Sequence, residues 1–157
     1  EDIGKGGFAI VKEVEMNGKH YAMKHLRPSI CTSRNGDQFS VAVADLLKEA
    51  EFESAFKSHP HIISIHAKHI SHQHMEENFI IIDRLTETLE QRMASWQARE
   101  SSQKTKKCHT LEQSKQFLCE RLQICLDICE TLQYLHNLNV IYRDLKAENL
   151  GFGTDGN

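Results

Sequence analysis

Four polar residues stand close together in the stretch YRDLKAEN, residues 142–149. Arg143 and Lys146 carry positive charge, Asp144 carries negative charge, and the amide of Asn149 both donates and accepts hydrogen bonds. The stretch follows an apolar, periodic segment, at a place where a chain normally contributes to its core. Buried polar groups require hydrogen-bond partners or a ligand. The sequence therefore indicates a candidate site on this loop.

Three glycines form a second candidate feature. Gly4, Gly6 and Gly7 lie in IGKGGFAIV, just before an expected strand. Because glycine has no Cβ, the backbone N–H groups of such a loop can approach an anionic ligand closely. The loop is not of the Walker A type, since no Gly-Lys-Ser/Thr follows and a strand rather than a helix comes next. By itself, the pattern indicates either a phosphate-binding loop or an ordinary turn.

A lysine follows on the next expected strand, in YAMK. Ala22 and Lys24 are two residues apart, so they point to the same face of a sheet. A small residue beside a lysine leaves room for a flat ligand and supplies one positive charge. A buried lysine needs a partner, and the next expected helix offers Glu49 on its apolar side, with Glu51 as the rival. The alternative is an exposed strand lysine.

A small set of elements must position these residues. The Asn17-Gly18 pair between two β-rich runs, over residues 8–26, predicts a tight type I′ hairpin. Strands dominate before Asp83 and helices after it, which predicts a sheet-rich unit followed by a helical one. The other expected elements are a loop over 28–40, a helix over 41–57, strands over 62–68 and 78–83, a short helix over 86–98, a polar loop over 99–114, a helix over 114–136 and a short strand over 140–142.

The bulk composition is typical of a soluble globular domain: the chain has 157 residues, of which 39% are hydrophobic and 26% charged. The net charge of -3 gives no general attraction to nucleic acid or to anionic membranes. No apolar run is long enough to span a bilayer, and the first residues do not resemble a signal peptide. We therefore expect no nucleic-acid or membrane partner.

Cysteines and histidines are the residues that most readily suggest metal sites. The chain has five cysteines and no C-x-x-C pair. Cys125 and Cys129 lie in an apolar periodic segment, so we interpret them as small core residues of a protein in a reducing compartment, cytoplasmic or nuclear. HAKHISHQH, residues 66–74, looks like a metal cluster, but a polar connection between two strands is the favoured interpretation.

Taken together, these motifs resemble a known family. YRDLKAEN resembles the catalytic loop of eukaryotic protein kinases. The glycine loop from Gly4 to Val11, the Ala-Met-Lys strand and the glutamate of the following helix occur in that family's order. The resemblance covers essentially the whole chain. It implies an α+β, protein-kinase-like fold, with an N-lobe and hinge over 1–85 and the start of a helical C-lobe over 86–157.

The resemblance also implies roles for individual residues. Asp144 would accept the proton of the substrate hydroxyl, and Lys146 would steady the transferring phosphoryl group. The remaining implied site residues would bind ATP or Mg²⁺: Gly4 and Gly6 at the phosphates, Lys24 at the phosphates and paired with Glu49, Ile3, Val11 and Ala22 around the adenine, Ile82 as gatekeeper, Asp83 to Leu85 as the hinge, and Asn149 at one magnesium ion. Lys146, two places after the Asp, is similar to the serine/threonine form, which implies a protein substrate with Ser or Thr.

Two functions remain open at this point. The first is an ATP-dependent serine/threonine kinase, which the presence of Lys24, Asp144 and Asn149 favours. The second is a pseudokinase or scaffold that binds partners without catalysis. The family's Asp-Phe-Gly motif is not in the sequence, so we expect a fragment of a kinase domain that transfers no phosphate alone and exposes the apolar stripe of the helix over 114–136.

Overall fold

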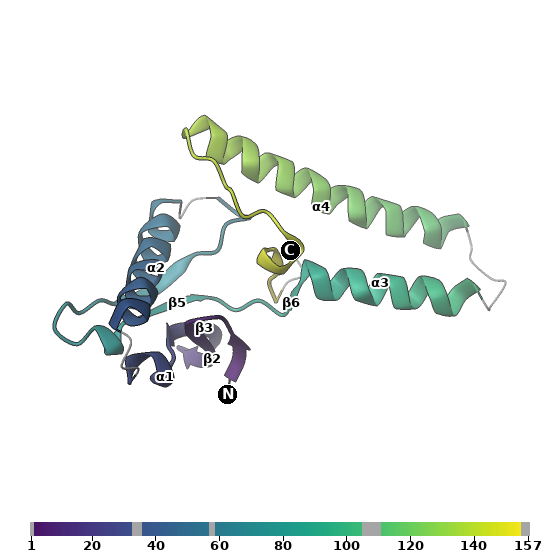
Figure 1. The fold of residues 1–157 in the computed structure, drawn as a ribbon. Coiled ribbons are helices and arrows are strands. Elements are labelled where there is room, and N and C mark those ends of the chain that lie inside the picture. The colour runs from purple at the N-terminus through teal and green to yellow at the C-terminus, as the bar shows by residue number, and fades with distance from the viewer. Residues whose placement is uncertain (1, 33–35, 57–58, 105–110, 155–157) are drawn as a thin grey trace. The chain divides into compact units, whose positions relative to one another are not determined.

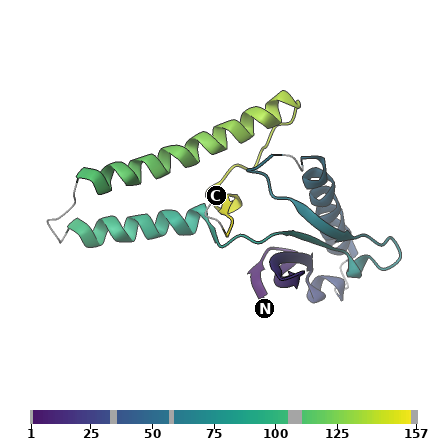
Figure 2. The same cartoon turned by 180° about the vertical axis from the view of Figure 1, so that it is seen from behind.

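The computed structural model describes residues 2–32, 36–56, 59–104 and 111–154. The chain divides into two compact units, Glu1–Arg84 and Leu85–Asn157. Figure 1 and Figure 2 show the strands and helices of both from opposite sides. The first unit is built on a sheet, and the second on two long helices.

The first unit contains a five-stranded antiparallel sheet in the order β1-β2-β3-β5-β4. Its strands are β1 (Asp2–Lys5), β2 (Ala9–Met16), β3 (Lys19–Leu26), β4 (Ile65–His69) and β5 (Phe79–Asp83). A short 3-10 helix, η1 (Met75–Glu77), precedes β5. The strands predicted within residues 62–68 and 78–83 are confirmed. Ile80, Ile81 and Ile82 are all buried, as expected for a strand covered on both faces.

The β2–β3 connection is the predicted tight hairpin. Asn17 has φ 53° and Gly18 has φ 73°, the left-handed values that a type I′ turn requires at both central positions. The register pairs Met16 with Lys19 and continues without a break to Val11 opposite Lys24. A local turn signal therefore decides where the lysine lies in the sheet.

One long helix covers the core of this unit. α2 (Gly36–Ala55) packs against the sheet with one side. The buried cluster that the helix and the sheet share consists of Ala22, Leu26, Ala42, Val43, Leu46, Ala50, Ile65, Ile80 and Ile82. Of the apolar residues on α2, Val43, Leu46 and Ala50 are buried, Leu47 is partly buried, and Phe52 is 36% exposed. Burial of this apolar side holds the helix on the sheet.

The prediction of a loop over 28–40 was wrong at both ends. Pro28 begins a short helix, α1 (Pro28–Cys31), because its fixed φ suits the first helical position. At the other end, α2 begins at Gly36 rather than at 41. Asp37 in its first turn interacts favourably with the positive end of the helix dipole, which apolar periodicity does not reveal. Residues 33–35 of the predicted loop lie outside the described residues.

The second unit is a helical hairpin with a short strand pair. α3 (Leu89–Lys104) and α4 (Leu111–Asn137) lie side by side in both views (Figure 1, Figure 2). The helix predicted over 114–136 is confirmed, and the one predicted over 86–98 begins and ends later. The predicted loop over 99–114 was wrong for Arg99–Lys104 and for Leu111–Ser114, which are helical; 105–110 lie outside the described residues. Glu100 of α3 forms an ion pair with Arg121 of α4, a contact between the two helices that apolar periodicity does not reveal.

The end of α4 sets the start of the candidate loop. Val140 N donates to Leu135 O at 2.9 Å and Asn139 N donates to His136 O at 2.9 Å, the two bonds of a Schellman cap. Asn139 has φ 60°, the left-handed value that this cap requires. The strand predicted over 140–142 was wrong: these residues leave the cap in irregular backbone. Val140 and Ile141 are β-branched and Tyr142 is aromatic, which favours a strand, but no neighbouring strand pairs with them in the described part of this unit.

After the loop, the chain forms η2 (Ala147–Asn149) and then β7 (Gly151–Phe152), which pairs antiparallel with β6 (Glu87–Thr88). Leu89 N donates to Leu150 O at 2.8 Å, and Thr86 N donates to Phe152 O at 2.8 Å. The guanidinium of Arg92 on α3 lies 3.3 Å from the centre of the Phe152 ring. These contacts fix the exit of the loop to the start of α3.

Gly151 is required for this close pairing, and we expect Gly151→Ala to destabilise the protein. A Cβ at this position would lie 2.6 Å from Leu85 Cδ1 and 3.2 Å from the carbonyl oxygen of Glu87. The Leu85 side chain must therefore move aside and the Glu87 backbone must shift slightly, at a combined cost of about 1–3 kcal/mol. Urea unfolding of the complete protein measures the loss. Gly7→Ala is the matched control, since a Cβ there meets no atom within 4 Å; equal stability of both variants would contradict the expectation.

The interpretation of the α4 cysteines as core residues was wrong. Cys119, Cys125 and Cys129 are exposed, on a helix whose Leu118, Leu122 and Leu126 are also exposed. The exposure of these three leucines agrees with the expectation that residues 1–157, taken alone, expose the apolar stripe of the helix over 114–136.

Cys31, at the end of α1, differs from the α4 cysteines in being partly buried. Burial, with a smaller contribution from the carboxylate of Glu76, raises the pKa of its thiol. Cys31 therefore stays a protonated thiol at neutral pH.

Among the helices in the described ranges, none is both long enough and apolar enough to cross a bilayer.

Candidate functional site

The predicted site residues of the first unit begin at the glycine turn between β1 and β2. Gly6 N donates to Ala9 O at 2.9 Å, which closes the turn. Gly4 lies opposite Val11, and a Cβ on Gly4 would meet the Val11 side chain at 3.5 Å. Around Gly7 no atom lies within 4 Å of a built Cβ. The turn therefore leaves backbone accessible beside the sheet, as a loop that approaches a ligand must.

Apolar residues form a wall next to this turn. Ile3 and Val11 pack against the buried cluster that contains Ala22 and Ile82. Ala22 lies directly opposite Ile82 in the β3–β5 register. The structure thus brings together, in one unit, the four side chains expected around a flat base.

Lys24 and Glu49 form the ion pair that the sequence suggested. Lys24 Nζ donates to Glu49 Oε1 at 2.6 Å and to Oε2 at 2.5 Å. The side chains are 27% and 30% exposed, so the pair is partly shielded from water but remains within reach of a ligand. The rival Glu51 is exposed. It lies about 200° around the helix from Glu49, because an α-helix turns roughly 100° per residue.

Asp83, at the end of β5, is held by its side chain as well as by the sheet. Ser64 N donates to Asp83 Oδ2 at 2.7 Å, and His66 Nε2 lies 2.6 Å from Asp83 Oδ1. Leu85 belongs to the second unit, where its Cδ1 approaches Gly151. The structure therefore describes the two ends of the expected hinge separately.

In the second unit, the loop brings Asp144, Lys146 and Asn149 together. Asn149 Nδ2 donates to Asp144 Oδ2 at 2.7 Å and to Asp144 O at 3.0 Å. Lys146 Nζ lies 3.3 Å from Asp144 Oδ2 and 3.9 Å from Glu148 Oε2. The η2 turn, closed by Asn149 N donating to Lys146 O at 3.0 Å, brings the amide and the ammonium to the same carboxylate oxygen, Asp144 Oδ2.

This arrangement suits proton transfer and cation binding. The Asp144 side chain is 68% exposed, so a hydroxyl group can approach the carboxylate directly. Because the Nδ2 group of Asn149 is committed to Asp144, its Oδ1 is left as an acceptor, and no described residue donates to it. Amide and carboxylate oxygens are the ligands that Mg²⁺ prefers. The residues present therefore fit a magnesium ion at this loop.

Residues 66–74 do not form one histidine cluster among the described side chains. His66 pairs with Asp83, His69 stacks on Phe79 with ring centres 5.7 Å apart, and His74 lies 3.7 Å from Glu76. Within this segment, no three described ligand atoms converge. The sequence did not reveal the link between His66 and Asp83, because this link depends on an irregularity in the β4–β5 pairing. The helix cap at Asn139 could have been predicted, since asparagine tolerates left-handed backbone.

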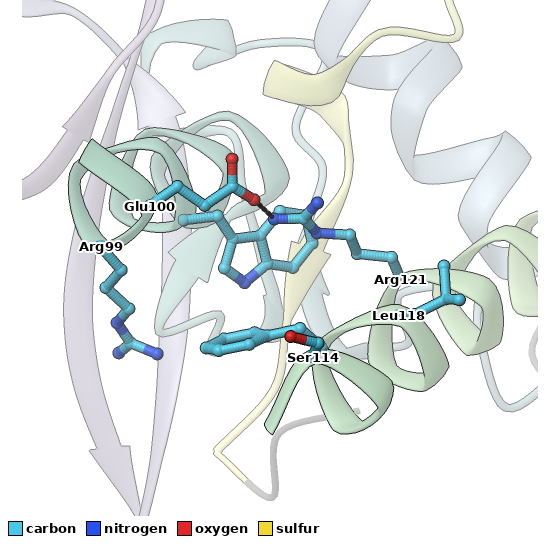
Figure 3. A pocket seen from close by; sticks show the side chains of 7 residues that line it. Arg99, Glu100, Ser114, Leu118 and Arg121 are labelled. Carbon is cyan, nitrogen blue, oxygen red and sulfur yellow. Dashed lines mark hydrogen bonds and ion pairs between the residues drawn. The ribbon is translucent and has the colours of Figure 1, made fainter. Parts of the chain in front are cut away.

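A hollow of about 270 Å³ lies between α3 and α4 (Figure 3). It is lined by Trp96, Arg99, Glu100, Ser114, Phe117, Leu118 and Arg121. Arg121 donates to Glu100 at 2.5 Å, and its guanidinium lies 4.9 Å from the centre of the Trp96 ring. The charges of Arg121 and Glu100 therefore neutralise each other within the hollow. None of the predicted site residues lines it, and we interpret it as part of the joint between the two helices.

The comparisons with known proteins all indicate one family. The family model described as "Protein kinase domain" matches residues 1–157. Serine/threonine-protein kinase sgk-1 of Caenorhabditis elegans is 32% identical over 150 residues, covering 94% of this chain and 27% of that protein. Serine/threonine-protein kinase Sgk3 of Rattus norvegicus is 26% identical over 152 residues, covering 94% and 25%. The Dual serine/threonine and tyrosine protein kinase of Takifugu rubripes is 24% identical over 151 residues, covering 95% and 14%. The chain thus spans between 14% and 27% of the length of these relatives.

Proposed function

Because the chain belongs to the protein kinase domain family, we propose that the complete protein transfers the terminal phosphoryl group of ATP to serine or threonine hydroxyls of other proteins. The observation that carries this proposal is the Lys24–Glu49 ion pair, with Nζ to carboxylate distances of 2.6 and 2.5 Å. In protein kinases this lysine–glutamate pair must be in place for activity.

The first unit supplies the nucleotide-binding residues in this proposal. Lys24, oriented by Glu49, neutralises charge on the α- and β-phosphates, and the backbone at Gly4 and Gly6 covers the phosphates. The wall of Ile3, Val11, Ala22 and Ile82 holds the adenine ring. The backbone from Asp83 to Leu85 contacts the edge of the base. The division of the chain at Arg84–Leu85 supports an assignment of residues 1–85 to an N-lobe with its hinge and 86–157 to the start of a C-lobe.

The second unit supplies the residues for the chemical step. Asp144 accepts the proton of the substrate hydroxyl as its oxygen bonds to the γ-phosphorus, while the bond from that phosphorus to the bridging oxygen breaks and ADP leaves. Lys146 offsets the negative charge on the transferring group. Asn149 keeps Asp144 oriented through its Nδ2 and offers Oδ1 to Mg²⁺, which would neutralise phosphate charge when bound.

The preference for serine and threonine is the finer part of the proposal. Lys146, two residues after Asp144, is the feature of the loop that resembles serine/threonine kinases. The names of the two Sgk relatives state serine/threonine specificity, whereas the name of the Takifugu relative also includes tyrosine. We therefore propose a protein substrate that presents Ser or Thr.

A transfer assay on the complete protein tests the proposal. With γ-labelled ATP and Mg²⁺, peptide pools that contain a single Ser, Thr or Tyr acceptor separate the possible substrates. We expect label in the Ser and Thr pools and none in the Tyr pool. Equal labelling of the Tyr pool would contradict the specificity but not the activity. Nucleotide binding without labelling of any pool would contradict the enzyme and favour a pseudokinase that only binds partners.

A further inference from the structure

The carboxylate of Asp83 is tied to the neighbouring strand by two donors. Ser64 N donates to Oδ2 at 2.7 Å, and the His66 ring nitrogen Nε2 lies 2.6 Å from Oδ1. The backbone N of Asp83 also donates to Ser64 O, at 3.3 Å. The last residue of β5 is therefore held by its side chain as well as by its backbone.

A local irregularity of the sheet aims His66 at Asp83. The β4–β5 register pairs Ile65 with Ile82 and then Ala67 with Ile81, so that His66 is an extra residue without a partner on β5. An extra residue of this kind bends a strand and redirects its side chain. In a regular ladder, His66 would lie opposite Ile82 rather than reach the end of β5.

Tyr21 of β3 completes the arrangement from the other side of β5. It lies opposite Asp83 in the β3–β5 register, and its ring centre is 4.5 Å from that of His66, with the planes inclined by 56°. Tilted contacts at this distance are favourable for aromatic rings. Side chains of three adjacent strands thus meet at the point where the sheet ends and the expected hinge begins.

We propose that His66 is a positioning residue for nucleotide binding: by holding the Asp83 carboxylate, it fixes the backbone that contacts the base. This inference rests on the proposed function, since it assumes that the segment after β5 binds adenine. A hydrogen bond to an ionised carboxylate is stronger than a neutral one, and a strand end that lost this bond would be held less firmly and would order the base contacts less well. The phosphate-binding residues, Lys24 and the glycine turn, do not touch this pair. Loss of His66 should therefore weaken binding of the base and leave binding of the phosphates unchanged.

Two ligands that each report one half of the nucleotide separate these effects. Adenosine has the base without phosphates, and inorganic tripolyphosphate has the phosphates without a base. Isothermal titration of the complete protein with each ligand compares His66→Phe, which keeps a ring against Tyr21 but loses the donor, with His66→Gln, which keeps an N–H near the position of Nε2. His69→Phe is the matched control, because it replaces another histidine of β4 that stacks on Phe79.

For His66→Phe we expect adenosine to bind roughly three- to tenfold more weakly, as for the loss of part of a charge-assisted hydrogen bond. We expect the tripolyphosphate affinity of His66→Phe to stay within about twofold of the wild type, because the phosphate-binding residues do not contact this hydrogen bond. His66→Gln and His69→Phe keep the hydrogen bond to Asp83, so their affinities for both ligands should also stay within about twofold. In the transfer assay, the KM for ATP rises while kcat is unchanged. If His66→Phe does not fold, His66→Asn, whose amide cannot reach Oδ1, replaces it as the variant that loses the donor.

Two results would overturn the inference. Unchanged adenosine affinity in the variant that loses the donor excludes a positioning role, and an equal loss for both ligands indicates a general structural role. If the wild-type protein binds neither adenosine nor tripolyphosphate, the proposed nucleotide site itself fails, and the inference fails with it. The wild-type titrations therefore distinguish failure of the function from failure of the role of His66.

Discussion

Lys24→Met is expected to abolish phosphoryl transfer by the complete protein, with a loss of roughly a hundred- to a thousandfold or more in kcat/KM. Methionine is similar in length and apolar character to the lysine stem but cannot carry the charge that approaches the phosphates. The ion pair with Glu49 disappears, and the glutamate, 30% exposed, is left to solvent. The fold should persist, because the core cluster under the pair is unchanged. Turnover is measured with labelled ATP, and folding by thermal denaturation.

The matched control is Lys19→Met, on the same strand. Lys19 is exposed at the start of β3, next to the hairpin turn, and is not part of the candidate site. Its replacement removes the same charge from the same strand, and we expect full activity. Equal losses in the two variants would mean that net charge matters rather than the ion pair. Normal transfer by Lys24→Met would remove the lysine from the proposed mechanism.

The parts of the fold that the sequence predicted well depend on local signals. The hairpin follows from Asn17 and Gly18, since few other residue pairs accept positive φ at both turn positions. The α+β fold class and the kinase resemblance are confirmed by the family match and by a five-stranded sheet followed by helices. The motifs succeeded because their order along the chain reflects this fold.

The errors arose where structure depends on partners distant in the sequence. β6 and β7 are two residues long each and are far apart in the chain, so no period marks them; their pairing depends on the close approach at Gly151. The predicted strand over 140–142 failed for the opposite reason, because an apolar run was present but no partner strand was available in the described part of its unit. Hydrophobic pattern alone cannot supply a partner.

The candidate site shows the same distinction. The sequence leaves both Glu49 and Glu51 as partners for Lys24, because residue spacing alone does not fix which side of the helix faces the sheet. The structure assigns the pair to Glu49, on the side of α2 that carries Leu46 and Ala50. His66 was interpreted only as part of a polar connection, since its role depends on an extra residue in the β4–β5 pairing. Such irregularities have no sequence signature that a single chain reveals.

Asp144→Asn is expected to abolish transfer while leaving nucleotide affinity nearly unchanged. Asparagine keeps the size of the side chain and can still accept a hydrogen bond from Asn149 Nδ2, so the loop should keep its shape. It cannot accept the proton of the substrate hydroxyl, and loss of a general base typically costs roughly a hundred- to ten-thousandfold in rate. Single-turnover measurements with labelled ATP give the rate, and titration with ADP and Mg²⁺ gives the affinity.

Glu148→Gln is the control for the loss of a carboxylate on the same loop. Its Oε2 lies 3.9 Å from Lys146 Nζ, against 3.3 Å for Asp144 Oδ2, so both substitutions remove one negative charge near that ammonium. Only Asp144 is also oriented by Asn149, and only its loss should stop the reaction. In the proposed mechanism Asp144 acts on the hydroxyl and not on ATP, so a large fall in ADP affinity would mean that it supports the nucleotide or the fold instead. Normal turnover by Asp144→Asn would show that another group accepts the proton.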